Sequence, residues 1–312
     1  MGMRRKEWAY KTVEARSLLL KSVREFFYKE GFLEVETPIM VSYQCLDPNI
    51  KDLSVVVQDF SGRKQKFFLS ASPENEMKKM LAAGFERIFQ ITRGFRDGEV
   101  TRTHNPEFTI LEWYRKDADY NDMMEDTVAL IQTVANALGK EEISYQGMKC
   151  ALFEEWEKLS LSEAFRRYAG AELFSEREDW EDWFFKTLIE KVEPKLGMGR
   201  PTFLYDYPKR LGTMAKEKEG RADLLERVEL YICGMELADG YSELTEAEEQ
   251  ERRFREASER EGKIMDVELL DALKKGLPRC AGIALGIDRL LMLFIDAPSI
   301  ADVLSPNFSN PA

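Results

Sequence analysis

Residues that could perform chemistry gather in the segment 89–115, FQITRGFRDGEVTRTHNPEFTILEWYR, where a polar loop separates two apolar arms. Side chains alternate in character with period two in both arms, which predicts the two strands of a hairpin. Because successive strand side chains point to opposite faces, Phe108, Glu112 and Tyr114 are expected on one face. The loop holds His104, the single histidine of the chain. This combination favours a functional hairpin over a half-exposed hairpin with a solvated loop.

Further acidic residues lie in the segment 226–244, ERVELYICGMELADGYSEL. Its glycines argue against a continuous helix. A hairpin that turns near Gly234 places Tyr231 opposite Glu236, with Glu229 diagonal on the same face. Two carboxylates that converge on a sheet face are costly unless a cation joins them. Mg²⁺ takes oxygen ligands of this kind, and a Lys or Arg partner is the alternative.

Two predicted helix starts carry other candidate site residues. In ASPENEMKKMLAAG, Ser72 is a good N-cap, Pro73 fits the first helical position and Glu74 lies in the first turn. Stabilisation of the helix dipole is the alternative role of Glu74. In CAGIALGIDRLLMLF, Arg289 lies in a first helical turn, where its charge opposes the dipole. It therefore needs a carboxylate partner, such as Asp288, or a ligand such as phosphate.

Composition excludes several classes of protein. The 312 residues contain no run of about 18 apolar residues, so no membrane span is predicted. The N-terminal MGMRRKEW lacks the apolar core of a signal peptide, and we expect a cytoplasmic protein. Four isolated cysteines and one histidine argue against a structural zinc site, and no G-x-S-x-G supports a serine hydrolase. A net charge of −12 lowers the expectation of a nucleic-acid substrate and favours a basic partner.

The remaining sequence predicts the elements that must position these residues. The expected elements are a helix over 11–30, a strand in FLEVETPIM, strands in LSVVVQDF and KQKFFLS, an amphipathic helix over 121–137, a small helical insertion at about 140–200, a short strand over 201–208 and a charged helix over 246–261. In the first helix, Leu19, Val23, Phe26 and Phe27 form one apolar stripe.

Three blocks of the sequence resemble motifs 1, 2 and 3 of the class II aminoacyl-tRNA synthetases. They are GFLEVETP after a helix, the FR-loop-HNPEF hairpin, and GIALGIDR at the start of the last helix. The segments between them are similar to the lysine branch, with HNPEFTILEWYR and ELADGYSEL as the most specific parts. The resemblance implies an α+β fold with an antiparallel β-sheet flanked by helices. It also implies one catalytic domain over 1–312 and a homodimer formed through the motif 1 region.

The start of the catalytic block close to residue 1 indicates which branch of this family the chain resembles. It leaves no room for the N-terminal anticodon-binding domain of lysyl-tRNA synthetases, so the chain looks like the elongation factor P–(R)-β-lysine ligase family. That resemblance implies ATP, Mg²⁺ and lysine or (R)-β-lysine as ligands, and a lysine of elongation factor P, rather than tRNA, as acceptor. Two alternatives stay open: a truncated lysyl-tRNA synthetase-like enzyme with another acceptor, and a non-catalytic paralogue that binds ATP or lysine and regulates a partner.

The resemblance assigns roles residue by residue. Arg96 would hold the α-phosphate and stabilise its charge, Phe108 would stack the adenine, and Arg289 would cover the other adenine face and reach the γ-phosphate. Arg96 and Arg289 are thus the expected catalytic residues. The expected ATP contacts are Arg96, Asp97, Gly98, Glu99, His104, Asn105, Phe108, Glu236, Leu237, Gly286 and Arg289. The expected substrate contacts are Ser72, Pro73, Glu74, Glu112, Tyr114, Asp239, Glu243 and Ala284, and the expected Mg²⁺ ligands are Glu229 and Glu236.

Three positions depart from the family pattern. Gly98 stands where motif 2 has a glutamate, so either Glu99 takes over after a small loop shift or one nucleotide contact is lost. Asp239 replaces an asparagine near the substrate carboxylate and would repel it unless protonated or turned away. Ala284 replaces a glycine of lysyl-tRNA synthetases, and one methyl group in a pocket changes selectivity by about 1–3 kcal/mol.

Overall fold

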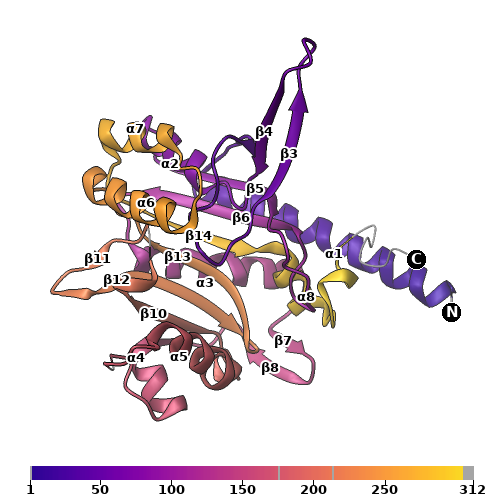
Figure 1. The fold of residues 1–312 in the computed structure, drawn as a ribbon. Helices are drawn as coiled ribbons and strands as arrows, with labels where there is room; N and C mark the ends of the chain where they lie inside the picture. Colours follow the sequence, from indigo (N-terminus) through magenta and orange to yellow (C-terminus); the bar gives the residue numbers. More distant parts are fainter. Residues whose placement is uncertain (1, 175, 213, 305–312) are drawn as a thin grey trace.

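A nine-stranded sheet runs through the centre of the molecule (Figure 1). The computed structural model describes residues 2–174, 176–212 and 214–304, with side chains from Tyr10 onward. In sheet order the strands are β1 (Leu33–Glu34), β5 (Arg87–Phe95), β6 (Glu107–Lys116), β14 (Cys280–Gly286), β13 (Met235–Ser242), β12 (Arg221–Ile232), β10 (Thr202–Pro208) and β9 (Glu157–Ser160), while β11 (Glu217–Lys218) pairs with β12. The pairs β1–β5 and β9–β10 are parallel and the others are antiparallel. The predicted α+β architecture is confirmed.

Three helices bury one face of this sheet. They are α1 (Gly2–Lys29), α3 (Tyr120–Ala137) and α8 (Ile287–Ile295). The predicted apolar stripe of α1 is buried, and Phe27 stacks on Phe89 of β5 with ring centroids 4.6 Å apart. Trp113 of β6 lies 5.3 Å from Phe27 in the same core. These aromatic contacts attach the longest helix to the two strands of the central hairpin.

Two separate helical groups cover the ends of the opposite face. One group comprises α2 (Glu74–Ala82), α6 (Ala247–Glu261) and α7 (Val267–Gly276). The other comprises α4 (Leu161–Ala164), α5 (Trp180–Thr187), two π-helical turns (Phe165–Ala169 and Leu188–Val192) and a 3₁₀ turn (Glu193–Lys195). Figure 1 shows the first group above the sheet and the second below it. Strands between the groups line the cavity described below.

The strand predicted in FLEVETPIM is much shorter than expected. It divides into β1, at the edge of the main sheet, and β2 (Met40–Val41), which pairs with β4 (Lys64–Leu69). Pro38 lies between the two pieces and has no N–H to donate to a continuous ladder. β4 also pairs with β3 (Leu53–Gln58), the other strand predicted in this region, and the hairpin that they form projects away from the body of the protein (Figure 1).

The prediction of a helical insertion at about 140–200 is wrong for its first part. Residues 142–151 form a hairpin of β7 (Glu142–Tyr145) and β8 (Met148–Ala151), and β9 then joins the main sheet. Ile143, Tyr145 and Cys150 are buried in the main core, with exposed residues between them. Helical structure begins at Leu161, where Trp180, Phe184 and other apolar residues form a core of their own.

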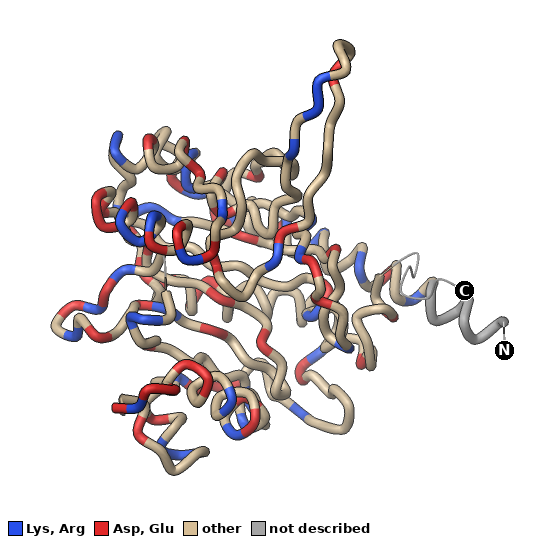
Figure 2. Tube along the Cα trace, viewed as in Figure 1, with Lys and Arg blue, Asp and Glu red and all other residues tan. Residues whose placement is uncertain are grey.

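Charges of both signs are interspersed along α6, which confirms the predicted charged helix (Figure 2). Arg252 pairs with Glu249 at 2.7 Å, and Arg255 pairs with Glu251. Such pairs on one helix surface each add a few tenths of a kcal/mol. None of the described helices combines the length and the apolarity that crossing a bilayer requires.

The packing of Phe27 generates a test of this core. Phe27→Ala should lower the free energy of unfolding by about 3–5 kcal/mol, because it removes a fully buried ring and leaves a cavity. Urea denaturation measures the change. The control Phe153→Ala removes the same atoms from a ring that is 46% exposed and should cost less than about 1 kcal/mol. Equal losses in both variants would contradict the assignment of this core.

Candidate active site

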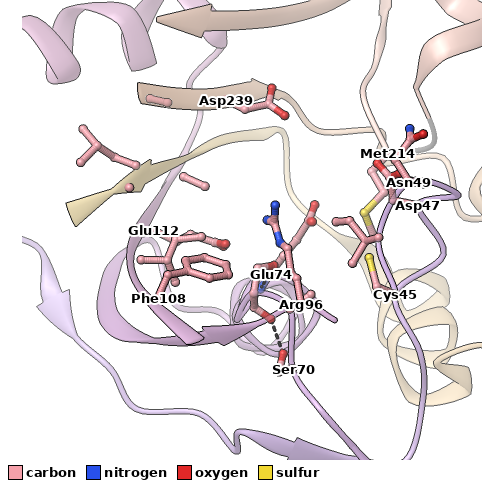
Figure 3. A pocket seen from close by; sticks show the side chains of 18 of the residues that line it. Cys45, Asp47, Asn49, Ser70, Glu74, Arg96, Phe108, Glu112, Met214 and Asp239 are labelled. Carbon is pink, nitrogen blue, oxygen red and sulfur yellow. Dashed lines mark hydrogen bonds between the residues drawn. The ribbon is translucent and has the colours of Figure 1, made fainter. Parts of the chain in front are cut away.

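A cavity of about 430 Å³ lies against the uncovered part of the sheet (Figure 3). It brings together most of the residues predicted from the sequence, namely Ser72, Glu74, Arg96, Glu99, His104, Asn105, Phe108, Glu112, Tyr114, Glu229, Glu236, Leu237, Asp239, Glu243, Ala284, Gly286 and Arg289. Pro73, Asp97 and Gly98 were expected in the site and do not line it. Figure 3 shows Phe108 and Glu112 of β6 together with Glu74, Arg96 and Asp239 around the cavity.

The alternation of β6 puts its functional side chains on the cavity face. Phe108, Glu112 and Tyr114 line the cavity, while Trp113 between them is buried in the core on the other face. Two glycines on neighbouring strands make room for the rings. A Cβ at Gly94 would come within 2.6 Å of the Phe108 ring, and one at Gly282 within 2.1 Å of the Tyr114 ring.

The start of α2 differs from the prediction by one residue. The helix begins at Glu74, and Pro73 takes the N-cap position because its ψ of 3° lies outside the helical range. The Ser72 hydroxyl accepts a hydrogen bond from the Glu74 N–H at 3.3 Å. Glu74 is in the first turn, as predicted, and its side chain reaches the cavity.

Arg96 lies beside the ring of Phe108. Its guanidinium carbon is 5.0 Å from the ring centroid, and Nη1 is 3.7 Å from a carboxylate oxygen of Glu99. Its buried Nε has no hydrogen-bond partner within the described part of the chain. A buried donor without a partner is costly, so this position suits an anionic ligand. Glu99 lines the cavity whereas Gly98 does not, which favours the interpretation that Glu99 takes over from Gly98.

Arg289 does not pair with the carboxylate of its neighbour Asp288; its guanidinium lies 3.9 Å from a carboxylate oxygen of Glu236. Its guanidinium donates to the backbone oxygens of Glu236 (2.8 Å) and Thr103 (3.3 Å) and contacts Nε2 of His104. Burial and the Arg289 charge lower the pKa of His104, so the imidazole is neutral and accepts this hydrogen bond. The alternative partner Asp288 pairs with another residue, Arg16, and accepts from the Thr109 N–H at 2.6 Å.

Three carboxylates form an acidic cluster in the cavity, defined by Glu74, Glu112 and Glu243. Glu112 is 2% exposed and accepts from the Tyr114 hydroxyl at 3.2 Å. Burial, assisted by the nearby Glu74 carboxylate, raises the pKa of Glu112 to about 8. Glu74 accepts a hydrogen bond from the Tyr241 hydroxyl. Several carboxylates and phenol oxygens thus converge where a cationic group would be stabilised.

Sequence reasoning missed two internal cations at this site. Lys78 lies 2.7 Å from Glu74 and 2.6 Å from Glu243, and its position four residues after Glu74 on one helix was an available signal. Arg227 donates to both oxygens of Asp239 at 2.9 and 3.0 Å. The strand period would have placed it on the face of Glu229, two residues later.

The hairpin of β12 and β13 has the predicted turn but an irregular register. Tyr231 lies opposite Glu236, as predicted, but a bulge before Tyr231 brings Glu229 directly opposite Asp239. Arg227 therefore bridges these two carboxylates, with 2.8 Å to Glu229. Arg227 is thus a cation on this face, but it pairs with Glu229 and Asp239 and not with Glu236, so the choice between a metal ion and a Lys or Arg partner for Glu229 and Glu236 stays open. Asp239 lines the cavity and has its carboxylate paired with Arg227.

Comparison with known proteins decides the family. The sequence matches the family model of class II tRNA synthetases (D, K and N) over residues 1–307. The chain belongs to this family. It is 37% identical over 302 residues to an elongation factor P–(R)-beta-lysine ligase of Salmonella paratyphi B, with 93% of each chain covered. A ligase of the same name from Salmonella gallinarum is 36% identical over 301 residues, again with 93% of each chain covered.

A lysine–tRNA ligase is similar to nearly the same extent. The protein of Thiobacillus denitrificans is 35% identical over 322 residues, which cover 95% of this chain and 63% of the relative. This chain therefore spans less than two thirds of the length of that relative. These three relatives are named as ligases, and the fold described above is that of a class II catalytic domain.

The predicted Mg²⁺ ligands differ in availability. Glu229 is buried and accepts from Arg227 and from the Tyr231 hydroxyl at 2.7 Å, whereas the side chain of Glu236 is 44% exposed. The described residues contain no group of three or more His, Cys, Asp or Glu side chains that could hold a metal ion. Mg²⁺ commonly uses one or two carboxylates together with substrate phosphates, so this donor set fits an ion that arrives with a nucleotide. The assignment of Glu229 and Glu236 stays a prediction.

The protonation of Glu112 generates a test by pH. Between the ordinary carboxyl pKa of 4.5 and about 8, the folded protein holds a proton on Glu112 that the unfolded chain lacks. This group therefore makes the free energy of unfolding fall as the pH rises through that window. Glu112→Gln removes the effect, so its stability relative to wild type should rise by at least about 1.4 kcal/mol, the equivalent of one pKa unit, between pH 5 and pH 8.

Urea denaturation at pH 5, 6.5 and 8 measures this difference. Glu125→Gln on the exposed side of α3 is the matched control and should follow wild type at each pH. A difference between Glu112→Gln and wild type that stays constant with pH would contradict a protonated Glu112.

Proposed function

We propose that this protein is an ATP-dependent ligase that activates lysine or (R)-β-lysine as an adenylate and transfers it to a lysine side chain of elongation factor P. One observation carries the proposal. A single cavity holds an acidic cluster, suited to an ammonium group, together with two arginines suited to phosphates. The names and near-complete coverage of the Salmonella relatives support the acceptor.

The arginines define the proposed nucleotide side. Arg96, with its unpaired Nε, would bind the α-phosphate and stabilise the charge that develops on it. Phe108 would stack the adenine, and Arg289 would cover its other face and bind the γ-phosphate. His104 and Asn105 would make further nucleotide contacts. Mg²⁺, held with the phosphates by Glu236 and Glu229, would supply charge neutralisation on the phosphate oxygens.

The acidic cluster defines the proposed amino-acid side. Glu74, Glu112, Glu243 and Tyr114 would bind the amino groups of a diamino acid, since a neutral or acidic side chain there would leave buried carboxylates unbalanced. Ala284 is opposite both Glu112 and Asp239 in the strand register. Its methyl group would restrict the space beside the substrate.

The reaction consists of two acyl-transfer steps. A carboxylate oxygen of the amino acid attacks the α-phosphorus of ATP, and pyrophosphate leaves. The product of this step is the aminoacyl-adenylate, a mixed anhydride of the amino acid and AMP. The ε-amine of the acceptor lysine then attacks its carbonyl carbon, loses a proton and forms an amide as AMP leaves. No covalent bond to the enzyme is required, because AMP is already a good leaving group. The chain supplies positioning and charge stabilisation.

We further propose a cytoplasmic homodimer that forms through the motif 1 region. Exposed apolar side chains on α1 and β1 support this surface: Tyr10 is 70% exposed, Tyr28 55% and Leu33 52%. Such residues are favourable at an interface between subunits.

ATP–pyrophosphate exchange with α-lysine and (R)-β-lysine in parallel tests the proposed function. We expect exchange with at least one of the two, favouring β-lysine. The acidic cluster would bind the amino acid and the arginines would bind ATP, and these are the two substrates of the exchange reaction. A second set of reactions contains purified elongation factor P or tRNA, followed by mass spectrometry of the factor and acid precipitation of the tRNA.

Each outcome distinguishes a candidate function. A mass gain on the factor with none on tRNA supports the proposal. Charging of tRNA would instead support the second candidate, a lysyl-tRNA synthetase-like enzyme, which the 35% identity to a lysine–tRNA ligase favours. Absence of exchange with either amino acid would contradict both and leave a non-catalytic paralogue.

Loss of Arg289 tests the nucleotide side. Arg289→Ala should reduce pyrophosphate exchange at least about 100-fold, as expected for removal of a charge-stabilising group, and leave the unfolding transition cooperative. The control Arg279→Ala removes an arginine that is 63% exposed and pairs with Asp119 outside the cavity. It should retain the wild-type exchange rate. Wild-type exchange in Arg289→Ala would refute the assignment of this site.

A further inference from the structure

A fully enclosed ammonium group lies behind the acidic cluster. The side chain of Lys78 is 3% exposed, and Lys78 is not among the residues that line the cavity. Its Nζ lies 2.7 Å from a carboxylate oxygen of Glu74, on the same helix, and 2.6 Å from a carboxylate oxygen of Glu243, which follows β13. A buried charge is unfavourable unless it is paired, so these contacts account for its presence.

The same two carboxylates are the ones expected to bind the amino groups of the substrate. The Lys78 ammonium therefore already contacts one oxygen of each of these carboxylates. Burial opposes the charged form of Lys78, but the Glu243 and Glu74 carboxylates outweigh it and raise the pKa of Lys78. Lys78 is thus charged at neutral pH.

We propose that Lys78 is a positioning residue that bridges Glu74 and Glu243 and directs both at the cavity, so that the acidic cluster is ready to receive an ammonium group. The inference rests on the proposed function in that it requires a cationic amino-acid substrate. Without Lys78 the cluster would have no cation beside it, and like charges that share a buried site retain more protons. A substrate ammonium would then have to displace those protons before it could bind.

The acidic cluster holds protons that an incoming ammonium would displace. Burial raises the pKa of both Glu112 and Glu243 to about 8, and the nearby charge of Lys78 acts to lower the pKa of each. An incoming ammonium therefore favours release of protons from these two groups. The titratable groups that act on this set come from α2, β6, β13, the residue after β13, and β14: they are Glu74, Lys78, Glu112, Tyr114, Tyr241, Glu243 and Cys280.

The test compares Lys78→Met with wild type. Methionine keeps the length of the apolar stem and removes the charge. We expect the KM for the amino acid to rise about tenfold or more at pH 7, the equivalent of one unit in the pKa of the cluster, with the KM for ATP unchanged. The rise should diminish toward pH 9, as the cluster loses its protons. An unchanged KM for the amino acid across this pH range would overturn the proposal.

Lys79→Met is the matched control. Lys79 follows on the same helix and also bridges two acids, Glu76 at 2.8 Å and Asp266 at 3.1 Å, but these do not belong to the acidic cluster. Its KM for the amino acid should equal that of wild type at each pH. A similar rise in Lys79→Met would assign the effect to helix stability and overturn the positioning role.

Proton release on binding gives a readout that a purely structural lysine would not change. Titration calorimetry at pH 7 in buffers of different ionisation enthalpy should show that Lys78→Met releases more protons than wild type when it binds lysine or (R)-β-lysine. If wild type binds neither amino acid, the proposed function fails and the inference fails with it, whereas binding with unchanged proton release in Lys78→Met overturns the inference alone.

Discussion

Several carboxylates can line one cavity because the chain places a cation between the members of two close pairs. Lys78 bridges Glu74 and Glu243, and Arg227 bridges Glu229 and Asp239. Removal of one partner from such a buried pair typically costs about 3–5 kcal/mol, since it leaves an uncompensated charge. The two bridges therefore determine which carboxylate oxygens remain available to a ligand, and the geometry of the cavity depends on them.

Sequence alone predicted the features that follow from the two-residue alternation of side chains along a strand. The hairpin of β5 and β6 presents Phe108, Glu112 and Tyr114 to the cavity as the alternation requires, and the turn near Gly234 is correct. The bridging cations were not predicted. Arg227 reaches Asp239 because a bulge shifts the register of β12 and β13, and such a shift depends on packing that no local pattern records.

The wrong predictions have two kinds of cause, tertiary packing and the local geometry of proline. Glu- and Trp-rich sequence after residue 140 favours helices locally, yet β9 forms because β10 offers it a parallel edge. Conversely, FLEVETPIM has a strand pattern, but Pro38 interrupts its ladder and the two short pieces pair with different sheets. The expected helix start at Pro73 was displaced by one residue for a local reason, the backbone angle of that proline.

The position of Arg96 over Phe108 has a consequence for the order of events at the site. The guanidinium lies 5.0 Å from the centre of the ring on which an adenine would stack under the proposed function. A contact of this kind is worth about 0.5–2 kcal/mol. Under the proposed function, an adenine stacked on that face of the ring would replace the guanidinium, which would then be free to bind the phosphate. Arrival of ATP would in this way move Arg96 from the Phe108 ring to the phosphate.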